Sequence, residues 1–254
     1  MGPSAYWRRS HLRASGAAPA SDNGGRRVLA LERDLRRGTR GALDARGVEP
    51  FWPAQLAAGA ALLFYLTLPH RLIMGPRWLV PGVEGVLLLA LVVTTPTRQS
   101  DQSPHLRTLV ILLLGLVSAT TLVSLILLAH FLLQGSKAGG EPLIFAGGVL
   151  WVTNILIFGI WFWELDRGGP GRRAHDGRES PDFLFPQMSE PRLAAGWRPR
   201  FVDYLYTSYT NAAAFSPTDT LPLTAMAKLL MATQSFIALV TLLLVVSRAV
   251  NVLG

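Results

Sequence analysis

A run of polar residues stands directly before the most hydrophobic end of this sequence, in the segment 206–223, YTSYTNAAAFSPTDTLPL. Hydroxyl, amide and carboxylate oxygens at this density could replace the hydration shell of a cation. The candidate site residues are Asp203, Thr210, Asn211, Ser216, Thr218 and Asp219. If these side chains lined a common path, within one bundle or between several copies, they would offer oxygens to a monovalent cation.

Three further polar residues interrupt otherwise apolar runs: Glu84, Asn154 and Gln234. An acid inside a membrane segment is a functional hypothesis by default. Because Glu84 lies only one turn into its run, a hydrated structural carboxylate near the interface is an equal alternative. Asn154 and Gln234 are expected to form hydrogen bonds between helices rather than to bind a ligand.

Several kinds of chemistry are absent from the sequence. There is no cysteine, so disulfides, thiolate metal sites and cysteine nucleophiles are excluded. No His/Asp/Glu spacing fits a metal site, and no nucleophile–base pair or phosphate-binding loop occurs. The sequence therefore predicts a protein that is not an enzyme and that carries neither a cofactor nor a metal.

The composition indicates an integral membrane protein. Half of the 254 residues are hydrophobic and only 16% are charged, against about a quarter in soluble domains. The apolar residues form long runs, which predicts an all-α, polytopic membrane helix bundle. Four transmembrane helices are expected, followed by a short polar helix and a long C-terminal transmembrane helix, at 51–68, 79–95, 108–133, 143–163, 201–215 and 225–252.

Charge outside these runs predicts the orientation. With a cytoplasmic N-terminus, 19 Lys and Arg residues fall in inside segments and three in outside ones, which satisfies the positive-inside rule. Residues 1–50 are expected to be a basic, largely disordered cytoplasmic tail. The 164–200 loop shows no regular pattern except Phe183-Leu184-Phe185, which is expected to fold back on the membrane surface. Only two of the 24 basic residues are lysine, a bias typical of GC-rich bacteria.

Two structures are compatible with the polar segment. A helix over 201–214 would be about 21 Å long, too short to span alone, and Pro217 and Pro222 interrupt the chain after it. One reading is a re-entrant element, whose irregular backbone must be buried in protein or line a wet cavity. The other is a fifth, polar transmembrane helix inside the bundle, with Thr224 as a cap of the last helix.

The region 203–254 resembles in its layout the pore module of the potassium-channel superfamily. It contains the stretch YLYTSYTNAAAFSPTDTLPLTAMAKLLM and the helix that follows. The filter motif differs, because AAFSPTD stands where those channels carry T-x-G-Y-G-D. The chain has no glycine between Gly196 and Gly254. Since glycine supplies the left-handed backbone angles that a carbonyl filter needs, a potassium-type filter is not expected.

Residues 51–254 also resemble a bacterial inner-membrane family classed as a domain of unknown function. The segments DYLYTSYT at 203–210 and FSPTD at 215–219 carry this resemblance. It implies a fold and a location, the bacterial inner membrane, and little chemistry.

Two functions follow from these expectations. The first is an oligomeric cation-conducting channel of pore-loop-like layout, with the lipid bilayer, further copies of the chain and a monovalent cation as partners. The second is a non-conducting membrane scaffold or accessory protein, in which 203–223 only packs helices together. Nucleic acid is not an expected partner, because the positive charge lies mostly where the positive-inside rule requires it.

Overall fold

The computed structural model describes residues 50–73, 78–94, 104–133, 140–175, 180–190, 192, 197–213 and 219–253. These belong to the second of two compact units, Gly47–Gly254. The predicted tail therefore lies outside the described residues, apart from Pro50. The described part is mostly helical, and its elements are α2 (Trp52–Thr67), η1 (His70–Leu72), α3 (Leu79–Thr94), α4 (Pro104–Leu133), α5 (Gly140–Leu165), η2 (Asp166–Gly168), α6 (Pro170–His175), β1 (Phe183–Leu184), α7 (Pro186–Ser189), α9 (Phe201–Ala213), β2 (Leu221–Pro222) and α10 (Ala225–Leu253).

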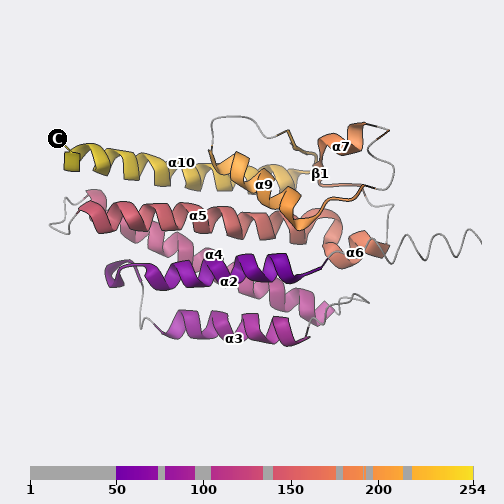
Figure 1. The fold of residues 1–254 in the computed structure, drawn as a ribbon, viewed down its shortest axis with the longest axis horizontal. Helices are drawn as coiled ribbons and strands as arrows, with labels where there is room; N and C mark the ends of the chain where they lie inside the picture. The colour runs from indigo at the N-terminus through magenta and orange to yellow at the C-terminus, as the bar shows by residue number, and fades with distance from the viewer. Residues whose placement is uncertain are drawn as a thin grey trace, which may run out of the picture. The chain divides into compact units, whose positions relative to one another are not determined.

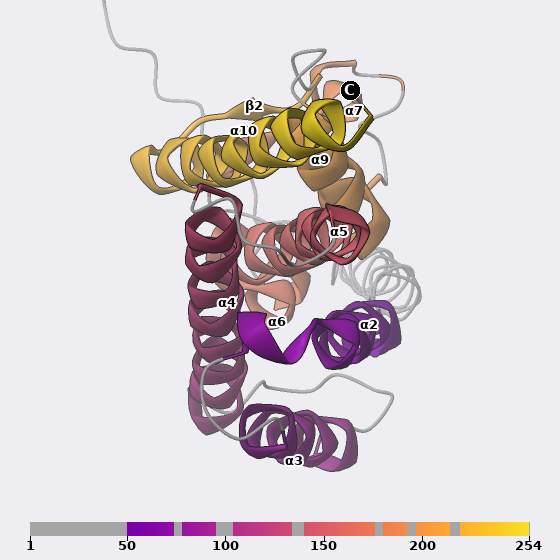
Figure 2. The same cartoon turned by 90° about the vertical axis from the view of Figure 1, so that its left-hand side faces the viewer.

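Helix α5 is the centre of the bundle. It packs against α2, α4, α9 and α10, whereas α3 lies outside and contacts α2 and α4 (Figures 1 and 2). In its most apolar stretch 67% of the residues are buried, against 28% in α4 and 22% in α10. The apolar faces of α4 and α10 are therefore free to contact lipid, while α5 supplies the core.

Within the described ranges, three helices are long and apolar enough to cross a membrane, at Arg107–Leu132, Pro142–Gly168 and Ala225–Val250. Large apolar side chains such as Leu229 and Phe236 are more than 60% exposed on α10, as expected of a surface that faces hydrocarbon. The chain is therefore a membrane-embedded helix bundle. Helices α2 and α3 have 16 residues each, about 24 Å, so length and composition do not identify them as spans.

The ends of the helices lie close to the apolar runs of the sequence. Helix α4 begins at Pro104, four residues before the expected start, because proline suits the first helical turn. Helix α5 extends the expected range 143–163 by three residues at its start and two at its end. Helix α9 is described as far as Ala213.

The described part of the 164–200 loop is folded into the protein, which corrects the expectation that its apolar residues lie on the membrane surface. Strand β1 pairs antiparallel with β2, with Phe183 opposite Pro222. Phe183 and Phe185 are 1% and 3% exposed, and the rings of both contact Tyr204 edge-on. Aromatic packing of this kind stabilises a core beyond the area that it buries.

Helix α9 enters the bundle and the chain returns to the same end. Phe201, at its start, packs on Trp163 near the end of α5, and Asn211 contacts Met231 and Gln234 further along α10. The returning chain passes Thr207, whose hydroxyl donates to Thr220 at 3.1 Å, and reaches β2 beside β1. The described residues thus fold back as a re-entrant element would, and no fifth helix crosses the whole bundle here (Figure 1).

Glycine at position 159 permits the close approach of α5 and α9. We expect Gly159→Ala to lower the free energy of unfolding by about 1–3 kcal/mol, because the added Cβ would lie 3.1 Å from Leu205 Cδ1 and 3.2 Å from its Cα. The control is Gly148→Ala on the same helix, where no atom lies within 4 Å of the added Cβ. Thermal unfolding in detergent measures both, and equal Tm values would contradict the tight contact.

Candidate functional site

The carboxylate of Asp166 joins three segments at the end of α5. Its Oδ2 accepts a hydrogen bond of 2.6 Å from the Tyr204 hydroxyl on α9, and its Oδ1 accepts one of 2.8 Å from the backbone N–H of Asp182. The Arg167 Nε lies 3.8 Å from Oδ2. Asp166 is fully buried, and a buried carboxylate is tolerated only when its oxygens are met in this way.

Asp182 connects the same turn to the start of α10. Its Oδ2 accepts from the backbone N–H of Arg167 at 2.8 Å, and its Oδ1 accepts from the Thr224 hydroxyl at 2.7 Å. Thr224 in turn accepts from the N–H of Ala227 at 3.3 Å, so it caps α10 as expected. The carbonyl of Asp182 also accepts from Leu223 N–H. One side chain thus orders both the end of α5 and the beginning of α10.

The backbone between α5 and α6 turns through left-handed angles. Arg167, Gly168 and Gly169 have φ of 52°, 74° and 101°. A Cβ at Gly169 would lie 3.1 Å from the Glu164 carbonyl oxygen and 3.3 Å from its carboxylate. Glycine adopts these angles without a steric penalty, so the turn packs closely over Glu164.

Arginines surround the buried Glu164. Arg107 Nε lies 3.9 Å from Glu164 Oε1, and Arg173 lies close enough to interact with it electrostatically. Arg173 also donates to the carbonyls of Trp163 and Asp166, and its guanidinium lies 5.1 Å from the centre of the Tyr204 ring. Guanidinium groups placed over aromatic faces are attracted to them, so this end of the bundle holds its charges among its aromatic residues.

Tyr204 remains a hydrogen-bond donor in this environment. Burial raises the pKa of its hydroxyl well above the ordinary value; the Arg173 cation opposes this shift, and the Asp166 carboxylate adds to it. A neutral tyrosine can donate to a carboxylate, whereas a tyrosinate cannot. The bond to Asp166 is therefore kept at physiological pH.

A second polar cluster lies between α5, α9 and α10. The Gln234 amide nitrogen donates to the Ser208 carbonyl at 2.9 Å and to its hydroxyl at 2.6 Å. The Asn211 amide nitrogen donates to Gln234 Oε1 at 2.8 Å and to the Met231 carbonyl at 2.9 Å. Ser235 donates to Asn211 Oδ1 at 3.0 Å, and Asn154 reaches the Gln234 carbonyl at 3.4 Å. The prediction that Asn154 and Gln234 bond between helices agrees with this geometry.

The structure separates the residues proposed for a cation path. Asn211 belongs to the cluster just described, and Thr210 donates to carbonyls of its own helix. Asp203 accepts from the backbone N–H of Arg200 at 2.7 Å, so it caps the start of α9. Asp219 is exposed. The remaining two candidates, Ser216 and Thr218, lie outside the described residues.

Sequence reasoning missed the network at the end of α5. The network joins residues in or beside a loop without periodicity. Asp182 is 16 residues and Tyr204 38 residues from Asp166, with which both form hydrogen bonds. One available signal was the pair of acids, Glu164 and Asp166, at the end of a long apolar run, since acids at membrane depth require partners.

The described residues contain no group of three or more His, Cys, Asp or Glu side chains that could hold a metal ion. The carboxylates of Asp166 and Asp182 are met by backbone N–H groups and hydroxyls. The two clusters therefore hold separate segments of the chain together.

We expect Asp182→Ala to loosen the 180–190 segment. The change removes two hydrogen bonds to a charged acceptor, each of which contributes about 1.5–3 kcal/mol. The Tm should fall, and trypsin should cleave at Arg178 or Arg192 faster than in the wild type. The control is Glu190→Ala, because the Glu190 carboxylate is exposed and accepts only one long bond, 3.4 Å, from Arg192 N–H. Unchanged cleavage in Asp182→Ala would contradict the network.

Comparisons of the chain with protein-family models, curated proteins and solved structures found no match. The resemblances to an inner-membrane family and to channel pore modules therefore stay predictions.

Proposed function

We propose that this chain is a non-conducting scaffold or accessory protein of the bacterial inner membrane, with its N-terminus in the cytoplasm. In this proposal, the polar segment 203–223 is a packing element that locks α9 and α10 onto α5. The supporting observation is that the buried amide of Gln234 and the half-buried amide of Asn211 bond to protein groups. In hydrocarbon such groups require internal partners.

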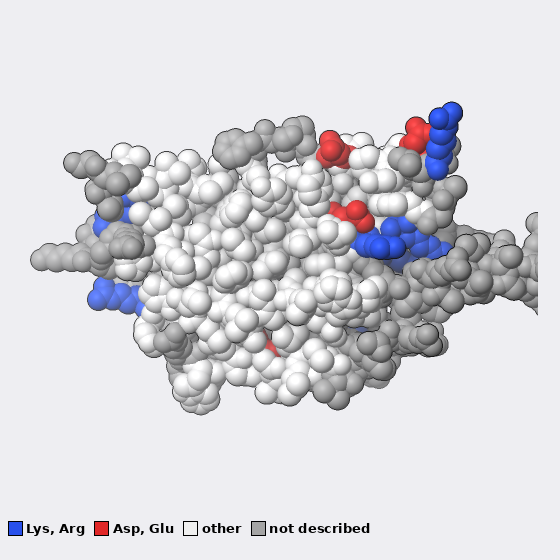
Figure 3. Space-filling view, viewed as in Figure 1, with Lys and Arg blue, Asp and Glu red and all other residues white. Residues whose placement is uncertain are grey.

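The distribution of charge supports a membrane position for the bundle. On the face shown in Figure 3, the Lys, Arg, Asp and Glu side chains of the described residues gather towards the two ends, and the band between them is almost free of charge. Helices α2 and α3 lie alongside α4 and α5 within this band (Figures 1 and 3). The proposal therefore has α2, α3, α4, α5 and α10 crossing the membrane, with the shorter two meeting a locally thinned bilayer.

A cation pathway receives less support from the same geometry. Conduction requires oxygens that face a shared, hydrated path, whereas the oxygens of Thr210 and Asn211 are turned to their own helix and to α10. The observation that favours the alternative, an oligomeric cation channel, is the exposed carboxylate of Asp219 beside the buried Thr220. A ring of such acids from several copies could attract cations.

Liposome flux separates the two functions. We expect wild-type protein in liposomes to give no more K⁺ or Na⁺ flux than protein-free liposomes, and Asp219→Asn to match it. Wild-type flux that falls in Asp219→Asn would establish the channel instead.

The packing role of the polar cluster can be tested by its effect on stability. Gln234→Leu should lower the free energy of unfolding by about 1–3 kcal/mol, because it removes a hydrogen-bond partner of Asn211 and Ser208. Its control is Thr233→Leu, at the exposed neighbouring position.

The orientation can be tested by cysteine labelling, since the chain has no cysteine of its own. In intact cells, Ser180→Cys should be protected from a membrane-impermeant thiol reagent, because the positive-inside rule places 164–200 in the cytoplasm. Ser136→Cys, in the opposite loop, should be labelled. Permeabilised cells provide the control, in which both become accessible. The reverse pattern in intact cells would invert the proposed topology.

A further inference from the structure

Glu84 lies inside the bundle with one carboxylate oxygen unmatched. It belongs to α3, and its side chain is 1% exposed. The Thr120 hydroxyl on α4 lies 3.1 Å from its Oε1. Its Oε2 is buried and has no hydrogen-bond partner among the described residues. A buried polar atom without a partner requires an explanation.

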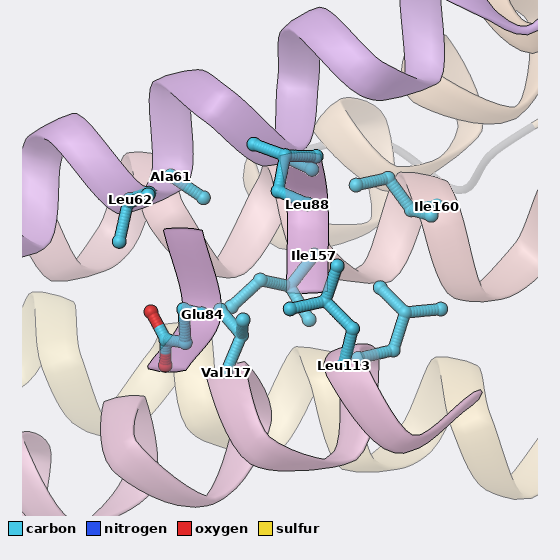
Figure 4. Close-up of a pocket in the computed structure, with 10 residues that line it drawn as sticks. Ala61, Leu62, Glu84, Leu88, Leu113, Val117, Ile157 and Ile160 are labelled. Atoms are coloured by element: carbon cyan, nitrogen blue, oxygen red, sulfur yellow. The ribbon is translucent and has the colours of Figure 1, made fainter. Parts of the chain in front are cut away.

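The space around this carboxyl is apolar. Glu84 borders a cavity of about 20 Å³, a volume that holds one water molecule. Figure 4 shows Glu84 beside Val117, with Leu62, Leu88 and Ile157 around the same space. An adjoining cavity of about 50 Å³ shares Leu88 and other apolar residues and extends to Phe51 and Trp163. The walls of the cavity beside Glu84 are wholly apolar, so Glu84 borders it with its hydrocarbon part.

No described cation compensates a charge on Glu84. From α2, the titratable neighbour is Tyr65, and α4 presents the hydroxyl of Thr120. Two basic residues of α4 whose side chains are described are engaged elsewhere: Arg107 faces Glu164, and the His130 ring packs on Phe131. Neither cavity is lined by Lys, Arg or His. An ionised carboxylate would therefore remain uncompensated in an apolar site.

We propose that Glu84 is a proton-binding site at membrane depth, which holds its carboxyl as the neutral acid where α3 packs against Thr120 of α4. In this form the group shares one hydrogen bond with Thr120 and places no charge in the apolar space. Glu164 differs in its surroundings, because Arg107 Nε lies 3.9 Å from its Oε1 as an ion pair, although neither of its oxygens has a hydrogen-bond partner among the described residues.

A lipid-soluble carbodiimide tests this proposal, because it reacts with protonated carboxyls that hydrocarbon can reach. The acid proton moves to a carbodiimide nitrogen, the carboxylate oxygen bonds to the central carbon, and rearrangement gives a stable N-acylurea with no atoms lost. With full-length protein in liposomes at neutral pH, we expect peptide mapping to find the adduct at Glu84 and not at Glu164. The adduct should be lost completely in Glu84→Gln. An adduct at Glu164 and none at Glu84 would overturn the proposal.

Infrared spectroscopy gives a second measurement that does not depend on reagent access. Wild-type protein at neutral pH should show the carbonyl stretch of a protonated carboxylic acid, and Glu84→Gln should lack this band. Circular dichroism of Glu84→Gln should show unchanged helicity, since the amide has nearly the same size as the acid. If the variant does not fold, a wild-type spectrum without the band still contradicts the proposal. A wild type without the band carries an ionised Glu84, and the proposal is then wrong.

Discussion

Two aspartates hold together the end of the bundle at which α5 finishes and α10 begins. Asp166 is fully buried and accepts hydrogen bonds from α9 and from the Asp182 backbone. Asp182 accepts from the turn after α5 and from the cap of α10. Together with the pairing of β1 and β2, these bonds fix the path of the described chain between α5 and α10. They also tie α9 to the end of α5, because the Tyr204 hydroxyl donates to Asp166.

The same constraint explains the polar character of α9. A helix buried between α5 and α10 in a membrane protein cannot send its polar groups to water, so each must be met inside. Ser208 donates to the Ile155 carbonyl on α5 at 2.7 Å and accepts from Gln234 on α10. The polar face of α9 is thus turned inward, while Val202 and Tyr206, both more than half exposed, lie on its outer face. Here a polar sequence stabilises helix packing and gives no evidence of a water-filled path.

Glu84 differs from the other buried acids of the bundle. Glu164 lies beside arginines, and Asp166 has backbone and hydroxyl donors. Glu84 has the Thr120 hydroxyl, lies near Tyr65 and borders an apolar cavity. One of its buried oxygens has no partner among the described residues, so hydrogen bonding between helices does not fully account for a carboxyl at this position.

The sequence by itself determined the membrane class and the positions of the helices. Apolar runs of this length have few alternatives to helices in a bilayer, and local signals such as Thr224 before α10 mark the helix start. The tertiary structure alone decided which polar groups meet. Asp182 and Thr224 are 42 residues apart, and Gln234 and Ser208 are 26 apart. The same structure turned Ser208 and Asn211 of α9 towards partners on α5 and α10 and left one buried oxygen of Glu84 without a partner among the described residues. Contacts over such separations depend on how the helices pack against α5, and no local pattern in the sequence encodes that packing.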